Sequence, residues 1–598
     1  MRGKYERIKT PTWFYRTELG RWLTAVAVSC GILAVVFLCI HPVFMTIDDA
    51  RLKYIYAGYS TGEPVASYLF CYYPLSLLLS ALYTWLPSIP WYALYQFTVI
   101  GLSSAVIGKT IYKIFYRKDL SFFRAIFLHI ALYLTLALIS TILIHFEVTA
   151  AMAGTAGAVL LLGVDFQKDS RGTRILDLAL SVFCIAACFA IQYNAFYSAC
   201  CYLLVALVAA VLNAVKNKTL KKTGAQLACY VLCLAVTVAA VKVSDNMVKD
   251  TDEWQEYLTY NKYRVSFWDY PHVTYDEDPE LFEELGWTRE FYNLTQSMYF
   301  MDERFNEEDL SQFTERFSWF DFGDPDEMLS TLDSTLSGLF KSERLAVLQS
   351  CVAELLLIAA LITACSKERW KKYYPQLIAV LCCLGGTVLL TLYLASRGRL
   401  PLRAWLAFSI PCIAVTTLLL MMTKESKWCR SRWKRRLKAG TALLLLVVWG
   451  GGMVWTYQEV AVEDWQWRAD RSEKVLYMED YVVQHPENVY VYDLAGAQNY
   501  SVFAAYPDSE KRPTNAFVWG SSYIHTPAYH DQLEKNGLDS LMTQDLLAEN
   551  VYFITAASNV YADQLYQMMY YEYGPIYMEI VDVIIDEFIV YKITEVSE

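Results

Sequence analysis

The sequence predicts an α-helical polytopic membrane protein with about eleven transmembrane helices and a C-terminal extracytoplasmic α/β domain. Windows of about 20 residues with scarcely a charge recur between Trp22 and Tyr457, as membrane spans require. Lys and Arg gather in the short segments between these windows, whereas Asp and Glu dominate residues 244–342 and 458–598. The net charge of -11 also argues against a nucleic-acid partner.

Basic clusters set the expected orientation, because Lys and Arg resist translocation and collect in cytoplasmic loops. The basic segment 1–9 starts inside, and the first apolar stretch lacks a cleavage site, so we expect it to remain as a signal-anchor helix. An odd number of spans then places the C-terminus outside. The expected spans are 22–44, 91–112, 122–144, 148–164, 175–191, 195–214, 224–243, 345–365, 374–395, 402–422 and 439–457.

Residues 50–90 are not expected to cross the membrane, although they contain the apolar run YYPLSLLLSALYTWLP. The run between Pro74 and Pro87 is too short to span, and its Tyr and Trp suit an interface. We predict juxtamembrane helices against the outer leaflet. The chain then divides into a transmembrane module 1–243 with its first outer loop 45–90, an acidic and aromatic outer region 244–344, a second transmembrane module 345–457, and an outer α/β domain 458–598.

The C-terminal part alternates strand-like and polar segments. NVYVYDL, NAFVWGSS, NVYFIT and MEIVDVIIDEFIVYKI are typical of strands, and Asp586-Glu587 is the expected turn of the last hairpin. The fifteen Cys lie in or beside apolar helices or on the cytoplasmic side, so a disulfide framework is not expected.

One loop does not follow the rule that Lys and Arg collect on the cytoplasmic side. Arg397, Arg399 and Arg403 fall on the expected outer side, between two spans. Guanidinium groups match phosphate oxygens bidentately, which would explain positive charge there. The alternative is that the arginines snorkel to lipid headgroups or pair with the acidic region 244–344.

Two adjacent carboxylates, Asp48 and Asp49, follow the first span directly. At a membrane surface one can act as a general base while the other orients it or holds a metal. The alternative is an ordinary helix start, in which both acids complement the helix dipole.

This motif, with Gly58, Gly62 and Pro64 after it, resembles the GT-C superfamily of lipid-phosphate-sugar-dependent glycosyltransferases. The resemblance extends to the architecture: juxtamembrane helices after the first span, some eleven spans, and an exported C-terminal domain. It implies that Asp48 or Asp49 is the catalytic base, or contacts a metal or the acceptor. It also implies a polyprenyl-phosphate-linked sugar as donor.

Further candidates lie at the same expected depth. Glu147, in a short outer turn, is a second acidic candidate, and the adjacent His145 could share a proton or a metal with it. A divalent cation such as Mg²⁺ or Mn²⁺ is left open, since no ligand spacing is present. Aromatic and polar side chains could line a sugar site or serve only as scaffold and caps. These are Tyr193, Asn194, Trp268, Asp269 and Tyr270.

Together these residues favour a membrane glycosyltransferase that moves a sugar from a polyprenyl-phosphate donor to a cell-surface glycan or lipid, with inversion at the anomeric carbon. A transporter or flippase of lipid-linked glycans is the first alternative, although it should show internal repeats and charges near the bilayer midplane, which are scarce here. The second is a surface-anchored binding scaffold. Residues 458–598 alone would suffice for a scaffold but not for a transferase.

Overall fold

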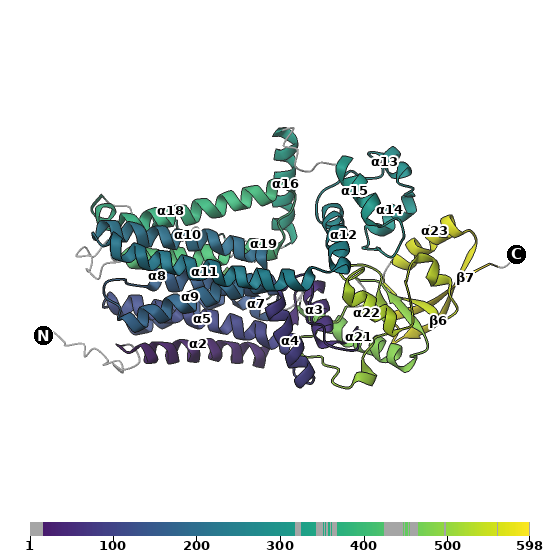
Figure 1. Ribbon diagram of the computed structural model, residues 1–598, viewed down its shortest axis with the longest axis horizontal. Coiled ribbons are helices and arrows are strands. Elements are labelled where there is room, and N and C mark those ends of the chain that lie inside the picture. The colour runs from purple at the N-terminus through teal and green to yellow at the C-terminus, as the bar shows by residue number, and fades with distance from the viewer. Residues whose placement is uncertain are drawn as a thin grey trace.

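The computed structural model describes residues 16–316, 325–342, 367–423, 465–494, 498–558 and 560–596, with scattered positions in 351–361 and 447–458. Figure 1 shows a bundle of long helices joined at one end to a smaller domain that contains the C-terminal sheet. Residues 252–316, which come between two helices of the bundle in the chain and form α12 to α15, lie beside that domain.

Within the described residues, eight helices are long and apolar enough to cross a membrane. Each coincides with a predicted span, and the prediction of a multi-span membrane protein is confirmed. They are α2 (Glu18–Cys39), α5 (Trp91–Arg117), α8 (Phe146–Gly163), α9 (Arg171–Ile191), α10 (Tyr193–Lys216), α11 (Leu220–Lys249), α18 (Lys367–Ser396) and α19 (Leu402–Thr423).

The count of eleven is not confirmed. The predicted span 122–144 divides into α6 (Phe122–Leu136) and the short α7 (Leu138–Ile142), followed by strand β2 (Leu143–Ile144). The predicted spans 345–365 and 439–457 fall mostly outside the described residues.

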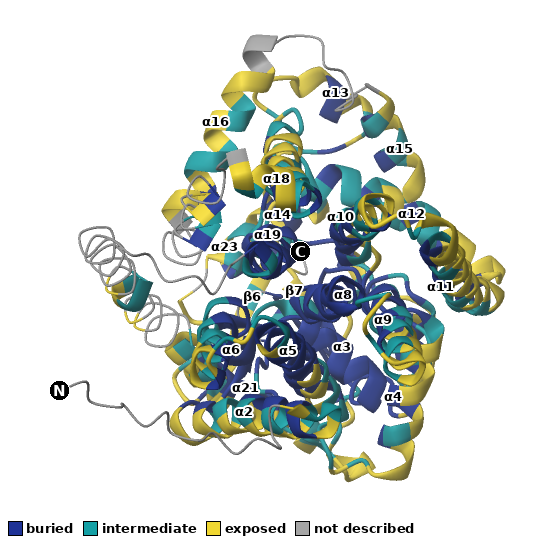
Figure 2. Cartoon of the chain, turned by 90° about the vertical axis from the view of Figure 1, so that its left-hand side faces the viewer, coloured by how far each residue is buried: buried dark blue, intermediate teal, exposed yellow. Residues whose placement is uncertain are grey.

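Helix α8 forms the centre of the bundle, and every one of its residues is buried. Its Ala- and Gly-rich sequence allows close packing: a Cβ on Gly154 would lie 2.4 Å from Ala199 Cβ, and one on Gly157 would lie 2.6 Å from Ile185 Cγ1. Figure 2 shows α8 buried at the centre, whereas α11 is mostly exposed at the edge. An exposed apolar helix fits a surface that faces lipid.

The first outer loop contains two short helices, as predicted: α3 (Ile47–Ala57) and α4 (Tyr73–Trp85). Strand β1 (Val43–Phe44) precedes α3 and pairs in parallel with β2. Gly58 ends α3 at φ 71°, and a Cβ there would lie 2.3 Å from the carbonyl carbon of Glu63, so the turn requires glycine. This turn leads the chain back across the end of the bundle.

The acidic region 244–344 contains five helices in its described part. Phe267, Phe282, Trp287 and Phe305 are buried together among them. Phe267 packs edge-to-face on Trp287 at 5.4 Å, and the rings of Phe282 and Phe305 are tilted against Trp287 at 6.1 and 5.9 Å. The helices are α12 (Asp252–Asp269), α13 (Pro279–Glu284), α14 (Arg289–Thr295), α15 (Glu307–Arg316) and α16 (Pro325–Ser342).

The C-terminal domain contains a five-stranded mixed sheet of order β4-β3-β5-β7-β6. Strand β3 (Val489–Tyr492) pairs in parallel with β4 (Ala516–Val518) and β5 (Val551–Ala556). Strands β6 (Ile576–Ile584) and β7 (Phe588–Glu595) form the predicted hairpin. The helices of this domain are α21 (Trp465–Gln484), α22 (Pro527–Lys535) and α23 (Tyr561–Tyr573), with 3₁₀ turns at Ser509–Lys511 and Thr543–Leu547.

The turn of that hairpin lies one residue earlier than predicted. Ile585 and Asp586 occupy its centre with φ values of 49° and 55°, and Glu587 N donates to Ile584 O at 3.0 Å. Two positive φ values match the right-handed twist of the strands. The β-branched Ile585 gave no sign of this in the sequence, because such residues rarely adopt positive φ.

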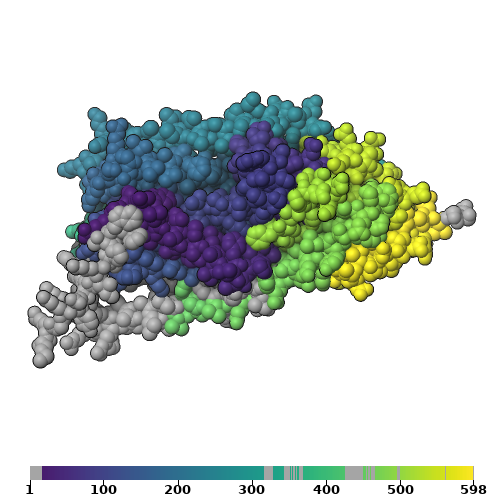
Figure 3. Space-filling view, turned by 90° about the horizontal axis from the view of Figure 1, so that it is seen from below, coloured from purple at the N-terminus to yellow at the C-terminus, as the bar shows by residue number. Residues whose placement is uncertain are grey.

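The C-terminal domain docks on the first outer loop. Arg51 donates to the Tyr492 hydroxyl at 2.8 Å, and Lys53 donates to the carbonyl oxygen of Ser501 at 2.8 Å. Viewed from below in Figure 3, residues early in the chain lie directly against the C-terminal domain. The end of the bundle that carries α3 is therefore covered by later parts of the chain.

Candidate functional site

Helix α3 presents the two adjacent carboxylates in different directions. Thr46 is its N-cap residue, and both acids lie in the first turn, where they complement the helix dipole. Asp49 is fully buried, whereas Asp48 is partly exposed. The helix-start explanation therefore accounts for where the pair lies, but not for what each side chain contacts.

Asp49 links three elements through hydrogen bonds. Its Oδ1 accepts hydrogen bonds from the Tyr92 hydroxyl at 2.9 Å, from Gln96 Nε2 at 3.1 Å and from the backbone N–H of Phe146 at 3.1 Å. Thr46 Oγ1 donates to Oδ2 at 3.3 Å. Burial raises the pKa of Asp49 to about 8 against the opposing effect of these donors. This carboxyl group holds α3 to α5 and α8.

Asp48 instead faces a cluster of charges. Burial raises the pKa of the Asp48 carboxyl, and the nearby charge of Asp269 adds to the rise. Three guanidinium groups oppose it, led by Arg403, with Arg264 and Arg399 also contributing. A carboxyl group with a raised pKa that keeps some access to solvent has the properties of a general base.

His145 and Glu147 begin α8 next to this pair. His145 Nδ1 accepts the backbone N–H of Glu147 at 3.0 Å, which assigns the ring proton to Nε2, 3.8 Å from Asp49 Oδ2. Burial lowers the pKa of His145 well below its usual value, so the ring is neutral. Glu147 is buried, and its Oε2 lies 3.4 Å from Arg403 Nε.

The three arginines have three different surroundings. Arg403, in the first turn of α19, faces Glu147 and Asp48. Arg399 pairs with Asp269 at 2.5 Å and lies over the Tyr270 ring at 5.4 Å. Arg399 therefore pairs with the acidic region, as one of the interpretations of this loop predicted. The guanidinium of Arg397, the residue after α18, instead lies over the ring of Tyr393 in the last turn of that helix, at 5.6 Å.

Gly398 fixes how this arginine loop approaches α12. It adopts φ 71°, and a Cβ there would lie 2.4 Å from Pro271 Cγ. Only glycine allows both the backbone conformation and the contact. The approach places Arg399 beside Asp269 and Tyr270, although about 130 residues separate them in the sequence.

Two residues of the cluster were missed by the sequence analysis. Arg264 is buried in α12, where its guanidinium donates to Asn261 Oδ1 at 2.7 and 3.1 Å. It shares a buried stripe with Tyr257, Tyr260 and Phe267, and an arginine at such spacing is a usable signal for a buried charge. Tyr68 is the other: it is fully buried near Asp48 and Arg264.

The remaining candidates are dispersed. Trp268 packs edge-to-face on Phe300 at 5.9 Å, in the core of the outer region. Tyr193 and Asn194 are exposed at the start of α10, where the Asn194 N–H donates to Gln192 Oε1 at 3.5 Å. The N-cap residue of α10 is therefore Gln192, and Asn194 supplies only its backbone N–H.

No group of three or more His, Cys, Asp or Glu side chains suited to a metal ion occurs among the described residues. Asp48, Glu147 and Asp269 share the cluster but do not form such a set. Binding of a divalent cation, which the sequence leaves open, remains a prediction.

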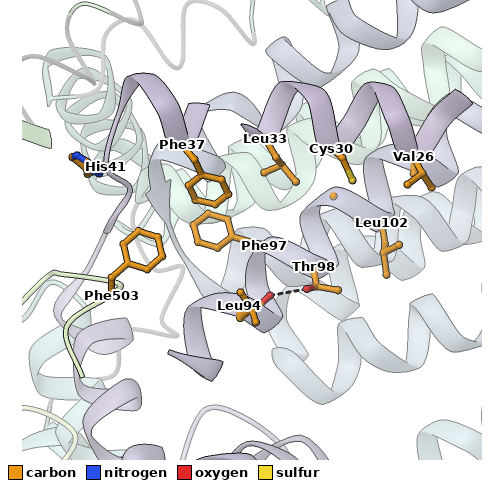
Figure 4. Close-up of a pocket in the computed structure, with 12 residues that line it drawn as sticks. Val26, Cys30, Leu33, Phe37, His41, Leu94, Phe97, Thr98, Leu102 and Phe503 are labelled. Carbon is orange, nitrogen blue, oxygen red and sulfur yellow. Dashed lines mark hydrogen bonds between the residues drawn. The ribbon is translucent and has the colours of Figure 1, made fainter. Parts of the chain in front are cut away.

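An apolar groove runs along the bundle near this end. It has a volume of about 530 Å³ and lies between α2 and α5, with Phe503 of the C-terminal domain at its end. Figure 4 shows Phe37 and Phe97 facing each other across it, and Thr98 bonded to the carbonyl of Leu94 in its own helix. Nearly all of its lining is apolar, so it offers no charge to select a headgroup.

Comparisons with known proteins give a faint likeness. No protein-family model and no curated protein matches the chain. Two solved structures of ArnT from Cupriavidus metallidurans align over 97% of both chains. The one bound to undecaprenyl phosphate is 11% identical with a TM-score of 0.36, and the apo one is 10% identical with a TM-score of 0.35. TM-scores this low do not establish a shared fold, so the functional argument rests on the residues of this chain.

Proposed function

We propose that this protein is a membrane glycosyltransferase that transfers a sugar from a polyprenyl-phosphate donor to an extracytoplasmic glycan or lipid. The observation that carries the proposal is the cluster at one end of the bundle, where Asp48 lies among Arg264, Arg399 and Arg403. A base beside several guanidinium groups suits a reaction in which a hydroxyl is deprotonated and a phosphate departs. The ArnT structure to which the chain is faintly similar is bound to a polyprenyl phosphate, undecaprenyl phosphate.

In this proposal Asp48 accepts the proton of the acceptor hydroxyl. The freed oxygen forms a bond to the anomeric carbon as the bond from that carbon to the phosphate oxygen breaks. The electron pair leaves with the lipid phosphate, whose charge Arg403 and Arg399 stabilise. Attack opposite the leaving group inverts the anomeric carbon.

Both arginines already have carboxylate neighbours, Glu147 and Asp269. A donor phosphate would therefore share or replace these partners. The pairs hold the guanidinium groups in place before the donor binds, which lowers the cost of orienting them. Glu147 acts in this proposal by positioning Arg403, and Asp49 by holding α3 on α5 and α8.

Asp48→Asn tests the proposal. The amide cannot accept the proton, so sugar transfer should fall by a factor on the order of 10³. Release of polyprenyl phosphate by purified protein, incubated with polyprenyl-phosphate sugars and candidate acceptors, measures the effect. Asp276→Asn, at an exposed surface pair, is the matched control. Full activity of Asp48→Asn would remove this residue from the mechanism.

A further inference from the structure

A second cavity lies close to the charge cluster but outside it. Its volume is about 650 Å³, and it opens where the end of α11 meets α12, the segment 69–72 and the start of α10. Lys242, Lys249 and Lys262 line it together with Tyr72, Tyr193 and Asn261. Three lysines around one cavity at the end of a membrane span indicate an anionic ligand.

The charges of the lining leave two ammonium groups available. Lys249 is paired with Asp245 at 3.1 Å, and Asp245 also accepts the backbone N–H of Tyr73 at 2.9 Å. Lys242 and Lys262 pair with no carboxylate in the described part of the chain. Their Nζ atoms lie over aromatic rings instead, at 5.3 Å from the Tyr72 ring and 4.8 Å from the Tyr263 ring. Exposed Asp250 offsets one of these charges, and the lining stays net positive.

Two exposed side chains of the cavity lining are apolar. Val243 and Met247, on the same turns of α11, are 55% and 75% exposed. Because most of α11 is exposed along its span, these side chains continue the surface that faces lipid. A ligand with a charged head and an aliphatic body fits this arrangement better than a free anion does.

The cavity and the charge cluster share a wall. Tyr68 faces the cluster, Phe70 packs on Phe146 at 5.4 Å, and Tyr72 lines the cavity, all within one short segment. Asn261, also in the lining, accepts both hydrogen bonds from Arg264 of the cluster. A molecule in the cavity would therefore lie next to the groups proposed to transfer the sugar.

We propose that this pocket binds the phosphate of an anionic membrane lipid through Lys242 and Lys262, and that this lipid is the acceptor. The second statement rests on the proposed function, but the first does not. The apolar groove of Figure 4 lacks the charges needed for such selection.

Lipid binding can be measured without any transfer reaction. Wild-type protein, studied by native mass spectrometry, should retain phosphatidylglycerol in preference to phosphatidylcholine, and salt should weaken the preference. The double variant Lys242→Ala/Lys262→Ala should lose about tenfold or more in phosphatidylglycerol affinity, since each lysine near an anionic lipid contributes about 1 kcal/mol. The variant Lys242→Arg/Lys262→Arg should retain the phosphatidylglycerol affinity.

Lys222→Ala is the matched control, because Lys222 is exposed near the other end of the same helix. Equal phosphatidylglycerol affinity of the double alanine variant and the wild-type protein would contradict lipid binding in this pocket. The absence of any preference for phosphatidylglycerol in the wild-type protein would contradict it as well. Competition by inorganic phosphate would assign the same site to a soluble phosphate. The alanine variant could lose lipid affinity while neither it nor the wild-type protein transfers sugar. That result would support the lipid-binding pocket and contradict the proposed transferase activity.

Discussion

Asp48 and Asp49 are neighbours in sequence, yet their surroundings differ completely. The Asp49 oxygens receive hydrogen bonds from four donors inside the protein, whereas Asp48 faces guanidinium groups and retains access to solvent. A substitution that replaces the carboxyl group should therefore change stability at Asp49 and chemistry at Asp48. The raised pKa of Asp49 gives this difference a pH dependence.

For Asp49→Asn we expect a changed dependence of stability on pH. The pKa of Asp49 rises on folding from 3.8 to about 8, so the folded state binds the proton more tightly. The resulting stability is fully present below pH 3.8 and is lost as pH rises through about 8, by up to about 6 kcal/mol. The Asn variant keeps the acceptor oxygen but does not titrate. Thermal unfolding in detergent between pH 4 and about 9 measures this, and parallel curves for variant and wild type would contradict it.

At the scale of elements, the helices α5 and α9 are joined by buried charges. Lys109 and Lys113 of α5 both contact Asp177 of α9, the latter at 2.7 Å, and Lys113 also pairs with Asp169 at 2.8 Å. Lys109 lies eight residues before the end of α5, so the group sits roughly 12 Å inside that end of the bundle, away from the charge cluster. A transporter would need ionisable groups inside its spans. The Lys and Asp side chains of this group, however, neutralise one another.

Asp177→Asn should destabilise the bundle. It removes the carboxylate that the two buried ammonium groups share, and leaves Lys113 with Asp169 and Lys109 with Glu18, whose Oε2 is 3.7 Å from Lys109 Nζ. Breaking a buried pair in this way costs about 3–5 kcal/mol. Asp119→Asn is the control: Asp119 is exposed near the same end of α5, and its φ of 51° suits Asn. Thermal unfolding in detergent compares the two. Equal stability of both variants would show that these charges do not hold the helices together.

For the whole molecule, the decisive feature is how separate parts of the chain meet above the bundle. The charge cluster draws Asp48 from α3, Glu147 from α8, Arg264 from α12 and Arg403 from α19. The C-terminal domain is fixed to the outer region by close backbone contact, since Phe300 N donates to Trp519 O at 2.9 Å. A Cβ on Gly520 would lie 1.6 Å from the carbonyl oxygen of Met298.

Gly520→Ala should therefore loosen this junction. A contact of that kind cannot be relieved by a side-chain rotation, so the backbone must shift, and we expect a loss of about 1–3 kcal/mol. Limited proteolysis should cut sooner between the outer region and the C-terminal domain. Gly172→Ala is the control, because a Cβ there meets nothing within 4 Å. Unchanged proteolysis of Gly520→Ala would show that the junction tolerates movement.

The sequence by itself determined that this is a membrane protein, where eight of its spans lie, and which segments form the C-terminal sheet. Apolar length and alternation are local properties, so they can be read without knowing any contact. It also singled out Asp48, Glu147, Arg399 and Arg403. It could not distinguish Asp48 from Asp49 or reveal Arg264 and Tyr68, and it did not find the lysine-lined pocket. Those depend on which helix faces meet, and burial and electrostatic fields are set only when distant segments pack together.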